Sequence, residues 1–248
     1  MVEQNDVLKQ LHSHASIRAF QDKPVSDDVM NEIFSAAFAG PNMQNYQPVT
    51  FIEITDQTLK QKITDTVHMG YIASAPRFYV VCVDWNRDLI GQDDEAKAVI
   101  EDRIQHYQFL EGGIVSASIT LGRAQVAAES LGLGTVTMAG VMGAFELYEQ
   151  ELDLPKYVKP IMGFSVGYPD QEPGVKPKLP LSGSVMADKY DEKKVEAAVN
   201  EYDQTMADYY AARDMDTNWT KHNAKLFKMI LADPRLSKYP MDKGLNLK

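Results

Sequence analysis

The 248-residue sequence contains a single cysteine, Cys82, and no apolar run that approaches the 18 residues of a membrane-spanning helix. A disulfide within the chain is therefore excluded, which favours a reducing compartment such as the cytoplasm. Cys82 lies in the apolar run FYVVCVDW, so we expect a small buried core residue rather than a reactive thiol. The first residues are polar and lack the apolar core of a secretory signal, so we expect no membrane association.

Basic residues are also scarce. The chain has 25 Lys and Arg against 35 Asp and Glu, which gives a net charge of -10 and a pI near 5.0. Binding to a nucleic acid backbone needs an excess of Lys and Arg on one face, and no such block occurs. An acidic surface is not attracted to anionic lipids either. We therefore expect neither a nucleic acid nor a membrane as the partner of this globular chain.

Three common kinds of site lack their sequence signature. His12 and His14 are two residues apart, the other histidines are isolated, and no H-x-x-x-H or C-x-x-C spacing occurs, so we expect no metal site. A dinucleotide-binding turn needs strand, glycine turn and helix in that order, whereas Gly132 and Gly134 follow a helix and precede a strand. The segment GFSVG lies within a strand pattern, so a serine hydrolase is poorly supported.

Apolar periodicity predicts secondary structure along the whole chain, without a linker or an internal repeat. We expect helices at about 5–12, 27–39, 56–67, 112–131, 144–152, 192–213 and 219–231, and strands at 49–54, 77–83, 135–138 and within 157–169. The first two strands are apolar on both faces, as in a sheet covered on each side. Helix 112–131 is apolar all round, which predicts a central, buried helix. Together they predict one α+β domain over residues 1–248, with an extended arm at about 180–248.

A small cationic cluster lies near the start of the chain, in the segment LHSHASIRAF. His14, Ser16 and Arg18 alternate there with apolar residues, so in an extended segment they project to one side. The Arg18 fork and the Ser16 hydroxyl are donors suited to a phosphate. Lys176 and Lys178 have the same spacing around a proline, which stiffens an extended backbone. A buried phosphate needs two such groups together, but each alone also fits a solvated surface.

Four motifs, in order, resemble the FMN-dependent nitroreductase family, in the branch of oxygen-insensitive NADPH nitroreductases and NADPH–flavin oxidoreductases. They are HASIR at 14–18, GPNMQNYQP at 40–48, AESLGLGTVTMAG at 128–140 and KPKLP at 176–180. The resemblance implies a mixed, mainly antiparallel sheet flanked by helices, with a long central helix and an extended C-terminal arm. It also implies a homodimer with two FMN molecules at the interface, each lined by both subunits.

The resemblance implies three groups of FMN-binding residues and no catalytic side chain. The group at the phosphate and ribityl chain is His14, Ala15, Ser16, Arg18, Lys176 and Lys178. The loop near the flavin supplies Asn42, Gln44, Asn45 and Gln47. The turn beside the isoalloxazine is Met138, Ala139 and Gly140, where a backbone N–H would bond the redox-active nitrogen.

The activity implied is that of an NAD(P)H oxidoreductase that reduces nitroaromatics, quinones or flavins by two electrons, with ping-pong kinetics. Two alternatives stay open. One is a flavin enzyme with a narrower substrate, such as one for reductive dehalogenation or flavin fragmentation. The other is a flavin-binding protein without turnover, since a fold does not fix a function.

The sequence departs from the branch at three places. Ala15 stands where a second arginine is usual, and Met69 and Gly70 occupy a region where a glutamine often contacts the flavin. Asp214 and Asp216 lie where NADPH-preferring members tend to carry basic residues. Because carboxylates repel a 2′-phosphate, we expect at most a modest preference for NADPH over NADH.

Overall fold

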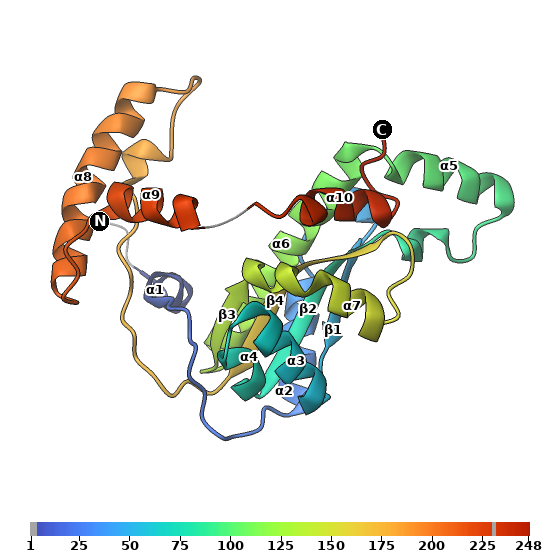
Figure 1. The fold of residues 1–248 in the computed structure, drawn as a ribbon, viewed down its shortest axis with the longest axis horizontal. Helices are drawn as coiled ribbons and strands as arrows, with labels where there is room; N and C mark the ends of the chain where they lie inside the picture. The colour runs from blue at the N-terminus through green and yellow to red at the C-terminus, as the bar shows by residue number, and fades with distance from the viewer. Residues whose placement is uncertain (1–3, 230–231) are drawn as a thin grey trace. The chain divides into compact units, whose positions relative to one another are not determined.

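The computed structural model describes residues 4–229 and 232–248. These form two compact units, one made of residues up to Gly174 together with Pro234–Lys248, and one made of Val175–Asp233 (Figure 1). Whether the two units act as one domain, as the sequence predicts, stays a prediction.

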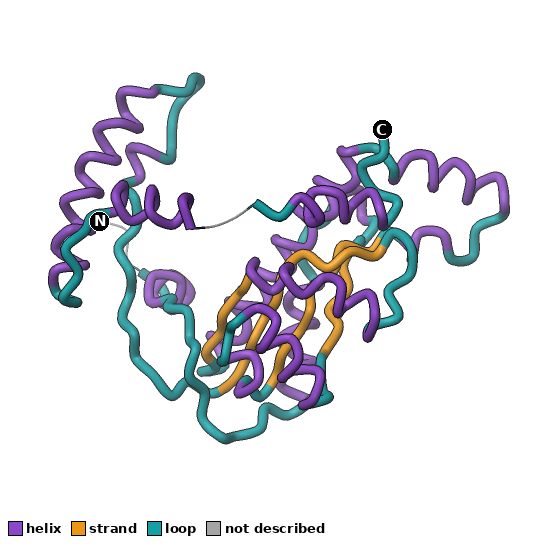
Figure 2. Tube along the Cα trace, in the orientation of Figure 1, coloured by secondary structure: helices purple, strands orange, loops and turns teal. Residues whose placement is uncertain are grey.

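The first unit is built on a four-stranded antiparallel sheet (Figure 2). Its strands are β1 (Val49–Glu53), β2 (Arg77–Asp84), β3 (Gly134–Met138) and β4 (Val158–Gly167), in the order β1-β2-β4-β3. Pro160 pairs with Cys82 in β2, where the register shifts. A proline has no N–H to donate, so it is tolerated at such an irregularity. The predicted α+β class with an antiparallel sheet is confirmed.

The helices of the first unit mostly follow the predicted pattern. They are α1 (Asp6–Ser13), α2 (Asp27–Phe38), α3 (Gln57–Val67), α4 (Tyr71–Ser74), α5 (Asp94–Ile104), α6 (Tyr107–Ser130), α7 (Phe145–Glu151) and α10 (Pro234–Asp242), with the 3-10 turns η1 (Met43–Asn45), η2 (Asn86–Leu89) and η3 (Ala139–Ala144). Ser26 caps α2 by accepting from the backbone N–H of Val29, as the sequence predicts. Helices α4, α5 and α10 were not predicted. α4 has only four residues, α5 buries only Ile104, and α10 contains a proline, Pro240, which is unusual inside a helix.

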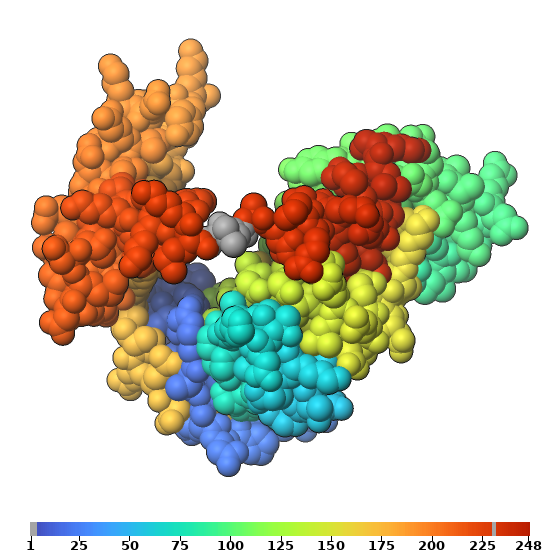
Figure 3. Space-filling model, viewed as in Figure 1, coloured from blue at the N-terminus to red at the C-terminus, as the bar shows by residue number. Residues whose placement is uncertain are grey.

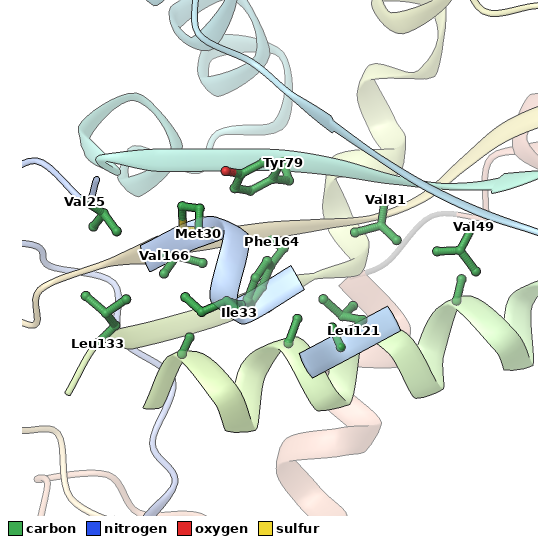
Figure 4. Packing of buried hydrophobic residues seen from close by; sticks show 14 residues of the cluster. Val25, Met30, Ile33, Val49, Tyr79, Val81, Leu121, Leu133, Phe164 and Val166 are labelled. Carbon is green, nitrogen blue, oxygen red and sulfur yellow. The ribbon is translucent and has the colours of Figure 1, made fainter. Parts of the chain in front are cut away.

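Both faces of the sheet are covered. α2 and α6 pack on one face, where Ile33, Leu121 and Phe164 meet in the core (Figure 4). α3, α4, η3 and α7 contribute to a second cluster, which includes Ile63 and Tyr148. The prediction of a sheet covered on each side is confirmed: β2 is buried along most of its length, and β1 packs Phe51 against one cluster and Ile52 against the other, although only its first residue is fully buried. β1 lies at the edge of the sheet, which explains the difference.

Helix α6 is less buried than the sequence predicts. Its small residues do face the sheet, and Ala117 and Ala124 are fully buried there. Val115, however, is 51% exposed, and Ile114 and Ile119 are 38% and 37% exposed. The prediction of a helix buried all round is therefore wrong for the single chain, because only one stripe of α6 packs against the sheet. The opposite side leaves an apolar face open to solvent.

The last residues return to the first unit (Figure 3). The Tyr239 hydroxyl donates to Glu149 Oε1, and Lys243 Nζ donates to Glu149 Oε2 at 3.0 Å. The backbone N–H of Tyr157 donates to the Lys243 carbonyl at 2.8 Å. These bonds, made by a segment that follows the second unit, fix α10 and the terminus to α7 and the start of β4.

The second unit contains η4 (Leu181–Gly183), α8 (Glu192–Ala211) and α9 (Trp219–Met229). Tyr202, Met206 and Tyr210 of α8 form its small core. The predicted helix at 192–213 is confirmed, and the predicted helix at 219–231 is confirmed as far as Met229. Residues 230–231 lie outside the described part of the chain.

Candidate functional site

The segment 14–18 is held against the first residues of β3. The backbone N–H of Ile17 donates to the Thr135 carbonyl at 2.8 Å, and the Ile17 side chain is buried. A Cβ added at Gly134 would lie 2.6 Å from Ile17 Cγ1, so this close approach requires a glycine at that position. With Ile17 turned inward, its neighbours Ser16 and Arg18 are left at the surface, as the alternation predicts.

His14 is anchored by residues that the sequence analysis missed. Its Nδ1 lies 2.7 Å from Glu129 Oε1 at the end of α6, and the Thr135 hydroxyl donates to the same oxygen at 2.9 Å. The side chains of His14 and Glu129 are only 30% and 13% exposed. The Gln125 amide nitrogen lies 2.8 Å from His14 Nδ1. Gln125 and Glu129 are four residues apart on α6, a spacing typical of one helix face.

Ser16 and Arg18 keep unused donors. In residues 4–229 and 232–248 no carboxylate forms an ion pair with the Arg18 side chain, and the Ser16 hydroxyl makes no hydrogen bond. The Arg18 guanidinium lies 5.9 Å from the centre of the Tyr71 ring. Its backbone N–H donates to Gln171 Oε1 at 2.7 Å. An arginine fork and a hydroxyl are thus free to bind an anion.

The turn after β3 lies beside the same segment. Met138 is buried, whereas Ala139 and Gly140 are exposed at the start of η3. A Cβ at Gly140 would lie 2.3 Å from Met69 Cε, so Met69 packs directly on this glycine. Because Met69 is two residues from Tyr71, the structure brings together Arg18, the segment 69–71 and the turn 138–140. Ala139 and Gly140 thus leave exposed backbone at this turn, with Met69 packed on the glycine.

The loop 42–47 has an unusual backbone. Gln44, Asn45 and Gln47 all have positive φ angles, of 48°, 60° and 54°. Asn42 Oδ1 accepts from the Gln47 backbone N–H at 2.8 Å. Positive φ is rare for residues with a side chain and occurs often at functional loops, where the surrounding contacts hold it. The backbone of the loop is therefore held in one defined conformation, which fixes where the side-chain amides of Gln44, Asn45 and Gln47 begin.

A single chain does not bring this loop to the cationic segment. The Met43 backbone N–H donates to Ser116 on α6, whereas His14 contacts Glu129 on the same helix. At 1.5 Å per residue these anchors are about 20 Å apart along α6. The loop also leads into β1 and the turn 138–140 follows β3, and these strands are the two opposite edges of the sheet.

Lys176 and Lys178 belong to the second unit, in which both are exposed. Lys176 Nζ lies 5.7 Å from the centre of the Tyr210 ring, and the Pro177 carbonyl between the lysines accepts from the Tyr202 hydroxyl at 2.7 Å. The KPK segment is therefore held against α8, a contact that the sequence did not predict. The binding of a phosphate by Lys176 and Lys178 stays a proposal.

The acidic turn after α8 is also exposed. The Arg213 guanidinium lies 3.7 Å from the Tyr209 ring centre, and its Nη1 donates to the Tyr209 carbonyl at 3.1 Å. Asp214 has a φ of 58° and, like Asp216, is exposed. The arginine is thus held by the helix it follows, while the two carboxylates face solvent.

Cys82 is a core residue, as predicted. It is fully buried, and this burial raises the pKa of its thiol to about 12, so the thiol is neutral at physiological pH. Among the described residues, no three His, Cys, Asp or Glu side chains gather as a metal site. None of the described helices combines the length and apolar character needed to cross a bilayer.

Comparison with known proteins places these features in a family. The model described as "Nitroreductase family" matches residues 11–168, and that described as "Nitroreductase family, C-terminal domain" matches residues 176–248. An FMN reductase [NAD(P)H] of Bacillus subtilis is 33% identical over 233 residues, covering 91% of this chain and 92% of the relative. An oxygen-insensitive NADPH nitroreductase of Salmonella typhimurium is also 33% identical, over 87% of this chain and 88% of its own length.

Solved structures of oxidoreductases are also similar to this chain over nearly its whole length. The hypothetical oxidoreductase YcnD from Bacillus subtilis has a TM-score of 0.91 and 31% identity, covering 99% of this chain and all of its own. The NADPH:FMN oxidoreductase from Vibrio harveyi, complexed with NAD+, has a TM-score of 0.84 and 26% identity, covering 98% of this chain and all of its own. With family models matching along most of its length, the chain belongs to the nitroreductase family.

Proposed function

We propose that the protein is an FMN-dependent NAD(P)H oxidoreductase that reduces nitroaromatics, quinones or flavins in alternating, ping-pong half-reactions. The names of its relatives, an FMN reductase and an oxygen-insensitive NADPH nitroreductase, support this activity. The observation that carries the proposal is the unused donors of Ser16 and Arg18 beside the turn 138–140. When bound, FMN would supply the two-electron exchange between the nicotinamide and the acceptor.

The residues of the first unit would bind and orient this cofactor. Arg18 and Ser16 would donate to the phosphate, with His14 beside them. Ala15 would line the phosphate as well, but its side chain adds no positive charge. Lys176 and Lys178 would add two positive charges, since a phosphate monoester sealed beside an apolar ring needs such compensation. Because Ala139 and Gly140 carry little or no side chain, the backbone there can approach the ring and donate an N–H to it. No side chain is assigned a proton-donating role.

We further propose a homodimer in which each site takes its loop from the partner. The loop that carries Asn42, Gln44, Asn45 and Gln47 lies about 20 Å along α6 from the cationic segment, too far for both to line one end of a ring within one chain. The exposed apolar face of α6, with Val115 51% exposed, supports association of two copies. A dimer that covers this face would also supply the second half of the site.

We propose that NADPH is preferred over NADH modestly at most. Asp214 and Asp216 are exposed, and the one basic residue beside them at this turn, Arg213, is stacked on Tyr209. The absence of disulfides and the need for NAD(P)H support a cytoplasmic location.

The test is the spectrum and turnover of the purified protein. We expect a yellow protein whose flavin absorbance is bleached by NADH or NADPH without oxygen and returns when a quinone or a nitroaromatic is added. A colourless protein that takes up no added FMN would contradict the proposal. Bleaching without return, for every acceptor tried, would favour the narrower flavin enzyme or the flavin-binding protein without turnover.

A further inference from the structure

Glu129 is a largely buried carboxylate that makes none of the proposed cofactor contacts. It lies at the end of α6, with a side chain only 13% exposed, next to the Gly132–Gly134 turn that leads into β3. One oxygen, Oε1, is shared by two partners, His14 Nδ1 at 2.7 Å and the Thr135 hydroxyl at 2.9 Å. A carboxylate removed from water in this way is costly unless donors surround it.

The chemistry of these contacts fixes the histidine ring. An ionised carboxylate only accepts hydrogen bonds, so the proton between the two groups lies on Nδ1, and His14 donates to Glu129. The Gln125 amide nitrogen lies 2.8 Å from Nδ1 and 3.3 Å from Nε2, so Glu129 and Gln125 together hold the ring in one orientation. Thr135 completes the arrangement, because its carbonyl accepts from Ile17 while its hydroxyl donates to Glu129. One residue of β3 thus fixes both the segment 14–18 and the carboxylate behind it.

We infer that Glu129 is a positioning residue for the FMN phosphate, acting through His14. The inference rests on the proposed function. With Nδ1 held by Glu129, the His14 ring keeps one orientation beside the donors of Ser16 and Arg18, where a phosphate would bind. Glu129 itself does not touch the cofactor. Its effect is therefore specific to the phosphate and depends on His14.

The experiment compares FMN with riboflavin, which has the same ring and ribityl chain but no phosphate. Dissociation constants are measured on the flavin-free protein by fluorescence for wild type, Glu129→Gln, His14→Ala and the double variant. We expect Glu129→Gln to weaken FMN binding about tenfold, the scale of one hydrogen bond to a charged group. Riboflavin binding should stay unchanged. In the His14→Ala background the second substitution should cost little more, because the partner through which Glu129 acts is gone.

Two further variants keep the test decisive. Glu32→Gln makes the same carboxylate-to-amide change on an exposed position of α2, and we expect it to leave both affinities unchanged. Thr135→Val removes only the hydroxyl that orients Glu129, and we expect a smaller loss for FMN alone. If Glu129→Gln does not fold, Thr135→Val carries the comparison.

The results that would overturn the inference differ from those that would overturn the proposed function. Equal weakening of FMN and riboflavin, or full additivity of the two substitutions, would make Glu129 a structural residue and overturn the inference. An unchanged FMN affinity in Glu129→Gln would overturn it as well, while leaving the proposed function intact. A wild-type protein that binds no FMN would remove both.

Discussion

Arg18 is the side chain with the most donors left unused at the cationic segment. Its guanidinium stacks toward Tyr71 at 5.9 Å and has no carboxylate partner in the described ranges 4–229 and 232–248. Arg18→Ala should weaken FMN binding by about 2 kcal/mol or more, because it removes a bidentate charged contact. Equilibrium dialysis with FMN measures the change, and Lys238→Ala, a charge removed from an exposed position of α10, is the control. An Arg18→Ala affinity equal to wild type would count against the site.

The acidic turn after α8 makes a prediction about the nucleotide. Replacing Asp214 and Asp216 together by Lys should raise kcat/KM for NADPH relative to NADH by about fivefold or more, since each exposed charge near a phosphate contributes up to about 1 kcal/mol. The gain should shrink in high salt. Glu196→Lys, at an exposed position of α8, should leave the ratio unchanged. A wild-type protein that strongly prefers NADPH would show that this turn does not face the nucleotide.

Residues with a chemical signature could be predicted from the sequence, and their supporting partners could not. The sequence predicted that His14, Ser16 and Arg18 lie on one side, because this arrangement depends only on an extended local backbone. Glu129 was missed, although it lies in one of the four motifs, because its role depends on a contact across 115 residues of sequence. The positive φ angles of Gln44 and Asn45 could not be predicted from the sequence either, since neither residue is a glycine.

At the level of elements, α6 depends on glycine where it crosses the sheet. A Cβ at Gly113 would lie 2.5 Å from Val83 Cγ1, a contact that side chains do not make without a shift. Gly113→Ala should therefore lower the free energy of unfolding by about 1–3 kcal/mol, despite the better helix propensity of alanine. Gly122 is a matched control in the same helix, because nothing lies within 4 Å of its Cβ position. Thermal unfolding of both variants checks the difference, and a Gly113→Ala protein as stable as wild type would contradict it.

Elements with strong periodicity or caps were predictable, and their degree of burial was not. α2 begins after the Ser26 cap as expected, but α6 exposes Val115 where its composition predicts burial. Apolar character all round a helix shows that each side avoids water, and it does not show whether the cover comes from the same chain. α10 was missed for another reason: its stability comes from Glu149, which accepts from Tyr239 and Lys243 far along the sequence.

At the level of the whole molecule, stability should depend on pH through Lys159. Burial lowers the pKa of this ammonium group from 10.5 to about 8. Between pH 8 and 10.5 the unfolded chain therefore holds a proton that the folded chain has released, so the cost of Lys159 to folding is full below pH 8 and is relieved as the pH rises. Lys159→Met should raise the free energy of unfolding by about 1–3 kcal/mol at pH 7.

Denaturant unfolding at several pH values checks this prediction. The advantage of Lys159→Met over wild type should shrink steadily as the pH rises from 8 toward 10.5. Lys238→Met, at a side chain that is 73% exposed, should show neither the gain nor its pH dependence. An advantage that grows with pH would have the wrong sign for a buried ammonium group.

The central claim is that each flavin site combines the cationic segment of one subunit with the loop of the other. Arg18→Ala and Asn45→Ala chains with different affinity tags can be co-expressed and the mixed dimer isolated. If the site spans two chains, one of the two sites in this dimer contains both substitutions and the other contains neither. We predict that the mixed dimer recovers about half of the wild-type FMN content, while each variant alone binds poorly. A mixed dimer that binds no better than the two parent variants would show that both residues serve one site within one chain, and would contradict the account.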